Sequence, residues 1–178
     1  DEMSENITHQ MLHKHYLTDH LILHISYDVT SMSKTRLHPD IKITRDRHGR
    51  SKPKSAHGTW RLDHPTDDLA QIRRGFLELY DQYVCPDFSV RKVTLCVANL
   101  LPEPAPANKT PTLIQTDLFN NYQEPDQQLQ HEQSNHNLQS AILAIREKYG
   151  KNAILRGTNF ESGATGISRN SQIGGHRA

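Results

Sequence analysis

The stretch Leu21-Ile22-Leu23-His24-Ile25-Ser26-Tyr27 decides the fold, because large apolar residues occupy every second position along it. The positions between them include the polar residues His24 and Ser26. Successive side chains of a β-strand point to opposite faces, so this period of two indicates a strand with one buried face. The sequence therefore predicts a half-buried strand at residues 21–27.

Two later stretches show the same period. Residues 58–62 place Trp60 and Leu62 on one face of a strand, and Thr59 and Arg61 on the other. Residues 90–100 place one set of side chains inward (Val93, Leu95 and Val97) and a second set outward (Lys92, Thr94 and Cys96). The sequence thus predicts three strands, each with one apolar face.

Two amphipathic helices accompany the strands. Residues 3–17 carry an apolar stripe that includes Met11 and Leu12, and residues 66–83 carry a stronger one with Thr66 available as the N-cap. The stripe of the second helix consists of Leu69, Ile72, Phe76, Leu79, Tyr80 and Tyr83. The order helix, strand, strand, helix, strand predicts an α+β fold with both helices on one face of a small sheet.

The other face of this sheet is predicted to be polar. Its residues are His24, Ser26, Thr59, Arg61, Lys92 and Thr94. Such side chains hydrogen-bond phosphates, but one solvated face is common in small sheets. The polarity of this face indicates a binding surface only when it is considered together with the charge of the segment that adjoins it.

The C-terminal part differs in composition. Residues 101–106 are rich in proline, and the residues that follow are rich in Gln, Asn, His and Glu. The predicted division is a folded domain at 1–102, a flexible linker at 103–135 and a largely disordered tail at 136–178. Within the tail, one short helix is predicted at 136–148, and no element is predicted for 163–178.

The net charge of +1 hides a strong segregation of charge. Residues 34–61 hold nine Lys/Arg residues against Asp40 and Asp46, a local charge of +7 that leaves −6 for the rest of the chain. The nine cations are Lys34, Arg36, Lys42, Arg45, Arg47, Arg50, Lys52, Lys54 and Arg61. We expect a protruding loop or a loosely paired hairpin arm whose partner is anionic, with nucleic acid the leading candidate. A merely solvated loop is the alternative.

A second candidate site is Gln115-Thr116-Asp117-Leu118-Phe119, inside the predicted linker. Leu118 and Phe119 are adjacent large apolar side chains with no core beside them, so they predict insertion into a pocket on another protein. Gln115 would supply amide hydrogen bonds. The alternative is that the pair packs back onto the preceding domain. The pentapeptide resembles the motif with which bacterial replication and repair proteins bind the sliding clamp.

Further segments extend this resemblance in a fixed order along the chain. They are residues 90–100, residues 115–119, the pattern from Ile142 through Ile145, Arg146 and Lys148 to Gly150, and the pattern from Ala164 through Arg169 and Asn170 to Ile173-Gly174-Gly175-His176. Together they resemble the C-terminal part of a bacterial Y-family translesion DNA polymerase of the UmuC type. The resemblance covers nearly the whole chain, and its most specific pieces are the clamp motif and the terminal segment.

This resemblance implies a little finger, a four-stranded sheet backed by two helices that lies along primer-template DNA. The DNA contacts that it implies are Lys34, Arg36, Lys42, Arg45, Arg47, Arg50, Lys52, Lys54, Thr59, Arg61 and Lys92. The clamp contacts that it implies are Gln115, Asp117, Leu118 and Phe119. The parent enzyme would act in the SOS response to DNA damage with Mg²⁺ in its palm. The palm is not in this sequence, so we expect neither catalytic residues nor a cofactor here, and only three of the four strands.

Other signals narrow the class of protein. The twelve histidines, including His9 and His13 at helical spacing, lack cysteine or acidic ligands at suitable spacing, so we expect them to be solvated and expect no metal. Neither a signal segment nor a bilayer-spanning run is present, and we expect a cytoplasmic protein. The alternative function is a free-standing nucleic-acid-binding adaptor, with RNA as one candidate ligand, although few aromatic residues fall on the polar face to stack bases.

Overall fold

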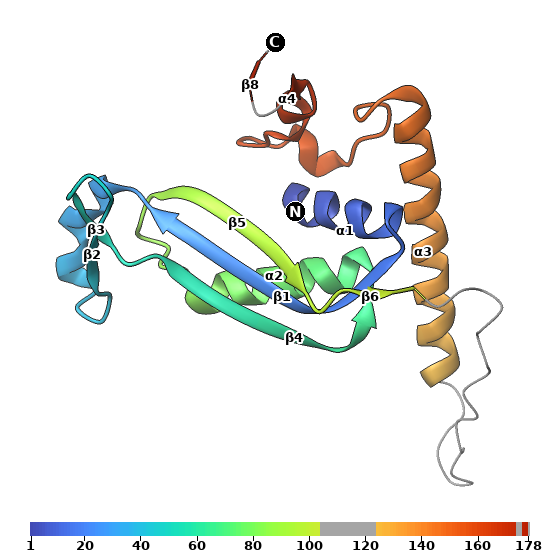
Figure 1. Ribbon diagram of the computed structural model, residues 1–178, viewed down its shortest axis with the longest axis horizontal. Helices are drawn as coiled ribbons and strands as arrows, with labels where there is room; N and C mark the ends of the chain where they lie inside the picture. The colour runs from blue at the N-terminus through green and yellow to red at the C-terminus, as the bar shows by residue number, and fades with distance from the viewer. Residues whose placement is uncertain (104–123, 174–175, 178) are drawn as a thin grey trace, which may run out of the picture. The chain divides into compact units, whose positions relative to one another are not determined.

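The computed structural model describes residues 1–103, 124–173 and 176–177, with side chains for residues 1–103 and 133–172 (Figure 1). By its internal contacts the chain divides into two compact units. Unit 1 comprises residues 1–17, 67–69 and 101–178, and unit 2 comprises residues 18–66 and 70–100. This grouping differs from the predicted boundaries at 102 and 135, because residues 1–17 group with the C-terminal elements.

The sheet of unit 2 is antiparallel, with β1 (Tyr16–Tyr27) between β4 (Ala56–Thr66) and β5 (Val90–Ala98) (Figure 1). Helix α2 (Leu69–Tyr83) covers one face of this sheet. The predicted α+β class and its three strands are confirmed. Each of β1 and β4 is longer than predicted, since β1 starts at Tyr16 and β4 runs on to Thr66.

The core of unit 2 lies between β1 and α2. Leu21, Leu23, Ile25 and Tyr27 are all at most 2 % exposed, which confirms the inward face predicted for this strand. Helix α2 and the turn after it bury Ile72, Phe76, Leu79, Val84, Cys85 and Phe88. Burying a side chain of this size stabilises the fold by about 1.5–3 kcal/mol, so this cluster accounts for much of the stability of the unit.

Two glycines let α2 approach the sheet closely. A β-carbon at Gly75 would lie 2.6 Å from Leu21 Cδ1, and one at Gly58 would lie 2.5 Å from Tyr83 Cδ2. Non-bonded carbons pack at roughly 3.5–4.0 Å, so a larger residue at either position forces neighbours apart. Tyr83, predicted to be part of the buried stripe, lies over Gly58 at the margin of the core and is 44 % exposed.

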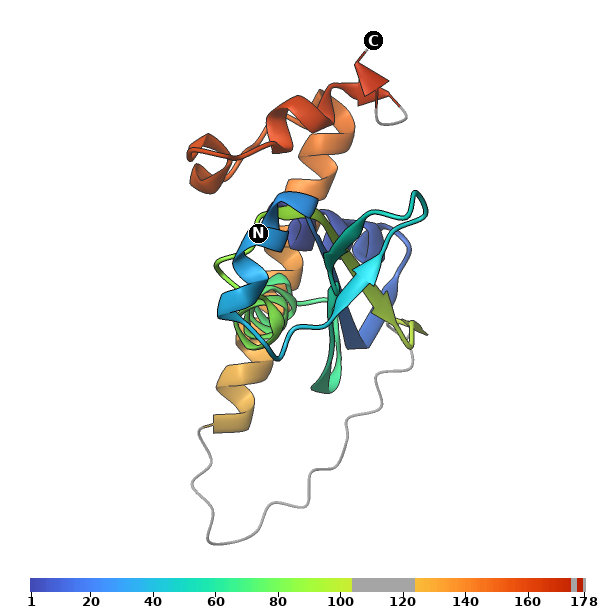
Figure 2. The same cartoon turned by 90° about the vertical axis from the view of Figure 1, so that its left-hand side faces the viewer.

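Between β1 and β4 the chain leaves the sheet as the basic arm, residues 28–55 (Figure 1 and Figure 2). The arm contains the 3-10 helix η1 (Val29–Leu37) and a hairpin of β2 (Ile43–Arg45) and β3 (Ser51–Pro53). Strand β3 packs against η1, and Pro53 is buried. Of the two predicted forms, a protruding loop or a hairpin arm, the structure has the hairpin.

Unit 1 is built on α1 (Glu2–His13) and α3 (Glu124–Tyr149), which contact each other. Its C-terminal elements are η3 (Gly157–Phe160), α4 (Gly166–Asn170) and the paired strands β7 (Gln172–Ile173) and β8 (His176–Arg177). The short strand β6 (Leu101–Pro102) pairs with Tyr16 and Leu17 at the start of β1. No helix in the described ranges is long and apolar enough to cross a membrane.

The helices differ from the prediction at their ends. Helix α1 stops at His13 instead of residue 17, because Tyr16 and Leu17 enter the sheet. Helix α2 starts at Leu69, and Thr66, which was predicted to be its N-cap, is instead the last residue of β4. Tertiary pairing of the strands thus overrides the local capping signal.

The C-terminal part contains more structure than the sequence predicted. Helix α3 has 26 residues and begins at Glu124, where a linker was expected, and α4 falls where no element was expected. The first half of α3 is mostly polar, with four Gln and two Glu of good helix propensity but no apolar periodicity, so a search for an apolar stripe misses it. Pro125 is compatible with the helix because it stands in the first turn.

Candidate nucleic-acid interface

The outer face of the sheet, which is the face opposite α2, carries the polar residues that the sequence placed there. His24 of β1 is paired with His57 of β4 and with Thr94 of β5. The remaining rows on this face are Ser26 with Lys92; Thr59, Ile22 and Cys96; and Arg61, His20 and Ala98. Paired residues share a face, so the six predicted side chains do lie together.

Two histidines on the outer face were missed by the sequence prediction. His57 lies next to His24, with ring centroids 6.2 Å apart, and His20 lies next to Arg61. Both fall outside the predicted strand limits, since β1 and β4 extend beyond residues 21 and 58. Carrying the period of two outward along each strand would have placed both on this face.

Arg61 of the outer face is held by an acidic neighbour in the same sheet. Its Nη2 lies 3.2 Å from Asp19 Oδ2, and Asn99 Nδ2 donates to Asp19 Oδ1 at 2.7 Å. The hydrogen bond from Asn99, followed by that from Arg61, lowers the pKa of Asp19. The Arg61 side chain remains 77 % exposed, so its remaining N–H groups face solvent.

An aspartate builds the tip of the basic arm. Asp46 Oδ1 accepts from the backbone N–H groups of His48 at 2.8 Å and Arg50 at 2.9 Å, and Oδ2 accepts from Arg50 Nε at 2.9 Å. Burial opposes ionisation of Asp46, but these hydrogen bonds from Arg50 and His48 lower its pKa overall. Gly49 adopts φ +76°, which a glycine reaches without strain. The turn therefore holds Arg47 at the end of the hairpin.

The predicted DNA contacts divide into two groups. Lys34 donates to the carbonyl of Asp87 at 2.7 Å, and Arg50 and Arg61 pair with Asp46 and Asp19. The other cations have no side-chain hydrogen bond or ion pair within the described ranges: Arg36, Lys42, Arg45, Arg47, Lys52, Lys54 and Lys92. Six of these seven are exposed and Lys52 is half-buried, so most of the positive charge here is open to an external anion.

The hairpin gathers three of these free cations on one face. Thr44 pairs with Lys52, and the backbone N–H of Lys54 donates to the carbonyl of Lys42 at 2.7 Å. Because paired residues share a face and every second residue returns to it, Lys42, Lys52 and Lys54 lie on the same side. Arg45 belongs to the opposite side, so the arm presents cations on both of its faces.

The two units carry opposite net charge over their sequence ranges. Unit 2 has thirteen Lys/Arg and eight Asp/Glu, a net +5, and unit 1 has eight Lys/Arg and twelve Asp/Glu, a net −4. The nucleic-acid candidates are therefore concentrated in the basic unit. A cation-rich surface attracts a polyanion over roughly one Debye length, about 8–10 Å at physiological salt.

Unit 1 contains a polar pocket of about 510 Å³ between α1, α3 and the C-terminal segment. Its lining includes Glu5, His9, Arg146 and Arg169. Several of these groups pair with neighbours: Arg146 and Arg156 both reach Glu5 Oε1 at 3.2 Å, and Arg169 Nη2 lies 3.7 Å from a carboxylate oxygen of Glu2. The buried Nε of Arg169 has no hydrogen-bond partner among the described residues. Arg146 and Arg169 of the pocket already face carboxylates, so the pocket is a weaker candidate for an anion than the exposed cations of unit 2.

The histidines that were considered as metal ligands have separate partners in unit 1. His9 bonds Gln139, His13 lies 3.4 Å from Glu147, and His15 lies 3.4 Å from Glu103. They do not converge on one point. The described residues do bring a different trio together in unit 2, His38 with Cys85 and Asp87.

The predicted clamp-binding residues Gln115, Asp117, Leu118 and Phe119 lie outside the described residues. Comparisons with protein-family models, with curated proteins and with solved structures found no match to this chain. The functional argument therefore rests on the geometry of unit 2 and on the sequence motifs.

Proposed function

We propose that unit 2 binds the sugar-phosphate backbone of duplex nucleic acid, without reading its sequence, through the basic arm and the outer face of the sheet. The observation that carries this proposal is the group of seven cations, six of them exposed, on the arm and on the adjoining sheet face, whose side chains make no hydrogen bond or ion pair with any other described residue. Lys and Arg that neutralise phosphates release counterions, and this release supplies most sequence-independent affinity.

The chemistry of the outer face favours a duplex over single-stranded RNA. Within the paired rows of β4, β1 and β5, the outward positions hold no Phe, Tyr or Trp. Sheet-based binders of single strands stack bases on such rings, and each stacked base contributes about 1–3 kcal/mol. Thr59, Thr94 and Lys92 instead offer hydroxyl and ammonium donors that suit phosphate oxygens.

We further propose that the chain serves as the DNA-holding and clamp-docking part of a Y-family translesion polymerase of the UmuC type. The ordered sequence resemblance and the pentapeptide Gln115–Phe119 support this role, and the α+β fold with a basic surface is compatible with it. Catalysis would belong to a palm supplied elsewhere in the parent enzyme. The alternative is a free-standing nucleic-acid-binding adaptor.

Binding measurements on the full chain separate these functions. Fluorescence anisotropy over a salt series should show tighter binding to primer-template DNA than to single-stranded RNA of equal length, and the same affinity for unrelated duplex sequences. The logarithm of the association constant should fall linearly with the logarithm of the salt concentration. A preference for the RNA would contradict duplex binding and favour the adaptor.

The docking role has its own test. Replacing Leu118 and Phe119 by Ala should abolish binding to a bacterial sliding clamp in surface plasmon resonance, because the two side chains are expected to fill its pocket. Duplex affinity should stay unchanged, since unit 2 is intact. Replacing Leu113 and Ile114 by Ala is the matched control outside the motif. Equal loss in both variants, or none in either, would contradict the docking assignment.

A further inference from the structure

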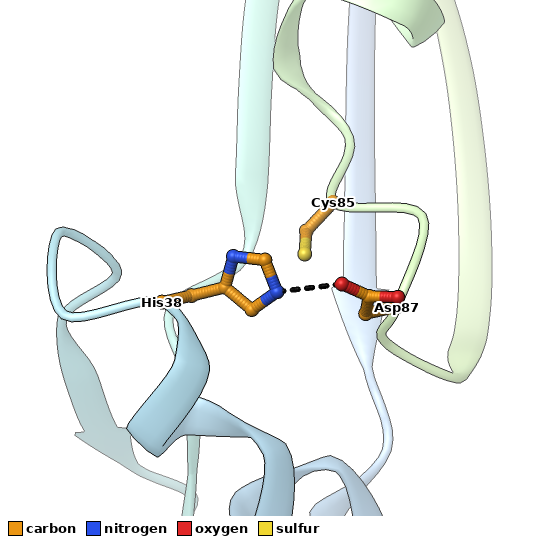
Figure 3. A group of neighbouring side chains, drawn as sticks. All are labelled: His38, Cys85 and Asp87. Carbon is orange, nitrogen blue, oxygen red and sulfur yellow. Dashed lines mark hydrogen bonds and ion pairs between the residues drawn. The ribbon is translucent and has the colours of Figure 1, made fainter.

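His38, Cys85 and Asp87 form a compact cluster at the base of the basic arm (Figure 3). One potential ligand atom from each side chain lies within 4.8 Å of the other two. His38 Nε2 is already 2.7 Å from Asp87 Oδ2. The cluster therefore offers one nitrogen, one sulfur and one oxygen around a single point.

The fold brings these residues together from two segments. His38 is the C-cap of η1 in the arm, whereas Cys85 and Asp87 stand on either side of Pro86 in the turn between α2 and β5. His38 is 47 residues from Cys85 in the sequence, which is why the search for short metal-binding spacings missed the cluster. Figure 3 shows the three side chains pointing toward one another from these two segments.

Hydrogen bonds fix the turn that carries Cys85 and Asp87. The backbone N–H of Cys85 donates to the hydroxyl oxygen of Tyr27 at 2.9 Å, and the backbone N–H of Ser89 donates to Ser31 Oγ at 2.9 Å. The ring of His38 meets the ring of Phe88 edge-on, with centroids 5.3 Å apart. Such fixed neighbours hold ligand side chains in place and reduce the entropy lost when they bind an ion.

The arrangement fits a metal site better than a catalytic relay. In a cysteine–histidine–carboxylate relay, one imidazole nitrogen faces the thiol and the other faces the carboxylate. Figure 3 shows the sulfur of Cys85 and the carboxylate of Asp87 near the same edge of the ring, the edge that carries Nε2. Side chains that converge on one nitrogen surround a shared point, as ligands of one ion do.

The donor set points to zinc. Zn²⁺ binds thiolate, imidazole and carboxylate at about 2.0–2.3 Å in a tetrahedron, so its ligand atoms lie roughly 3.3–3.8 Å apart. Binding requires the pair of His38 and Asp87 to open by about 1 Å, and the Asp87 side chain is free to do so because it is 56 % exposed. A thiolate and a carboxylate also balance the charge of a divalent ion.

We propose that His38, Cys85 and Asp87 bind a divalent transition-metal ion of the zinc class, with water completing the tetrahedron. Because Asp87 and His38 reach solvent while Cys85 is 8 % exposed, the ion enters from the surface. A bound ion would tie η1 of the arm, which carries His38, to the turn before β5. The inference does not depend on nucleic-acid binding.

The test uses the full reduced chain with its two cysteines exchanged one at a time. Co²⁺, added as a spectroscopic probe, should bind at one equivalent and produce a sulfur-to-cobalt charge-transfer band together with the visible bands of a tetrahedral ion. Zn²⁺ should then displace it. Cys85→Ser should remove the charge-transfer band, and the matched control Cys96→Ser, at the exposed cysteine on the sheet, should keep it.

Surface variants keep the test independent of folding defects at the buried cysteine. His38→Asn and Asp87→Asn should weaken Zn²⁺ binding by at least about tenfold in competition with a chromophoric chelator, whereas His48→Asn at the hairpin tip should not. Zn²⁺ should also slow tryptic cleavage of the arm in the wild type and in Cys96→Ser. The proposal is overturned if no thiolate band forms, or if the cluster variants and their controls bind Zn²⁺ equally well.

Discussion

Cations serve opposite purposes in the two units. In unit 1, Arg146 and Arg156 both reach Glu5, and Arg146 also donates from Nε and Nη2 to the carbonyl of Ile154 at 3.0 and 2.9 Å. In the basic arm of unit 2, most Lys and Arg side chains make no such contact within the described residues. Unit 1 therefore uses its arginines to hold its own fold, whereas unit 2 leaves its cations available to a partner.

Burial explains why the difference matters. The Glu5 side chain is 8 % exposed and the Arg146 side chain 14 % exposed, so neither can fully regain water when its partner is lost. A charge left unpaired in such a place is strongly destabilising, whereas an exposed cation is stabilised by water and is worth little to the fold. Stability should thus respond to changes in unit 1, and binding to changes in the arm.

The largest expected effect on stability is at Glu5. Glu5→Gln removes the carboxylate between two arginines and should lower the free energy of unfolding by about 3 kcal/mol, measured by urea denaturation of the full chain. The matched control is Glu147→Gln, because Glu147 is 55 % exposed and its ion pair is with His13. The control substitution should lower the free energy of unfolding by at most about 1 kcal/mol. Equal losses would remove the distinction between buried and exposed pairs.

A smaller and pH-dependent effect is expected at His9. Its Nε2 donates to Gln139 Oε1 at 3.2 Å, and its Nδ1 accepts from Arg146 Nη1 at 3.1 Å. Burial lowers the pKa of His9, the hydrogen bond to Gln139 opposes this, and the positive charge of Arg146 lowers the pKa further. The folded state therefore keeps His9 neutral at a pH at which the unfolded chain is already protonated.

The direction in which stability changes with pH follows from this lowered pKa. Above about pH 6.5, His9 is neutral in both states and does not change stability. As the pH falls below that value, the unfolded state binds the proton first. The free energy of unfolding then declines until the pH reaches the folded-state pKa. The loss is about 1.4 kcal/mol for each pH unit in this window. His9→Gln should flatten this part of the urea-unfolding profile, and His13→Gln should not. A profile unchanged by His9→Gln would refute the assignment.

The sequence predicted the parts of unit 2 that depend on local pattern. The period of two along β1 and β5 placed the inward and outward residues correctly, and the lack of apolar periodicity around Gly49 indicated a protruding loop or a hairpin arm. Both signals arise within a few residues of each other along the chain. Strand pairing then puts Thr59, His24 and Lys92 on one face without further information.

The features that the sequence did not predict depend on contacts between residues that are far apart in the chain. Arg156 and Glu5 are 151 residues apart, and Asn159 reaches Glu2 across 157 residues. The contact of His38 with Cys85 likewise joins residues that are far apart in the sequence. The mostly polar first half of α3 has no apolar stripe, so only helix propensity could have indicated it, and propensity alone is a weak predictor.

The salt dependence of duplex binding tests the central claim most directly. The arm variant replaces Lys42, Arg47 and Lys54 together by Ala. The matched control replaces the exposed Lys14, Lys148 and Lys151 of unit 1 by Ala, which removes the same amount of charge. The arm variant should weaken binding to all duplex sequences alike and reduce the slope of log K against log salt by roughly 2 to 3, while the control keeps the wild-type slope. Equal slopes in the two variants would contradict the account.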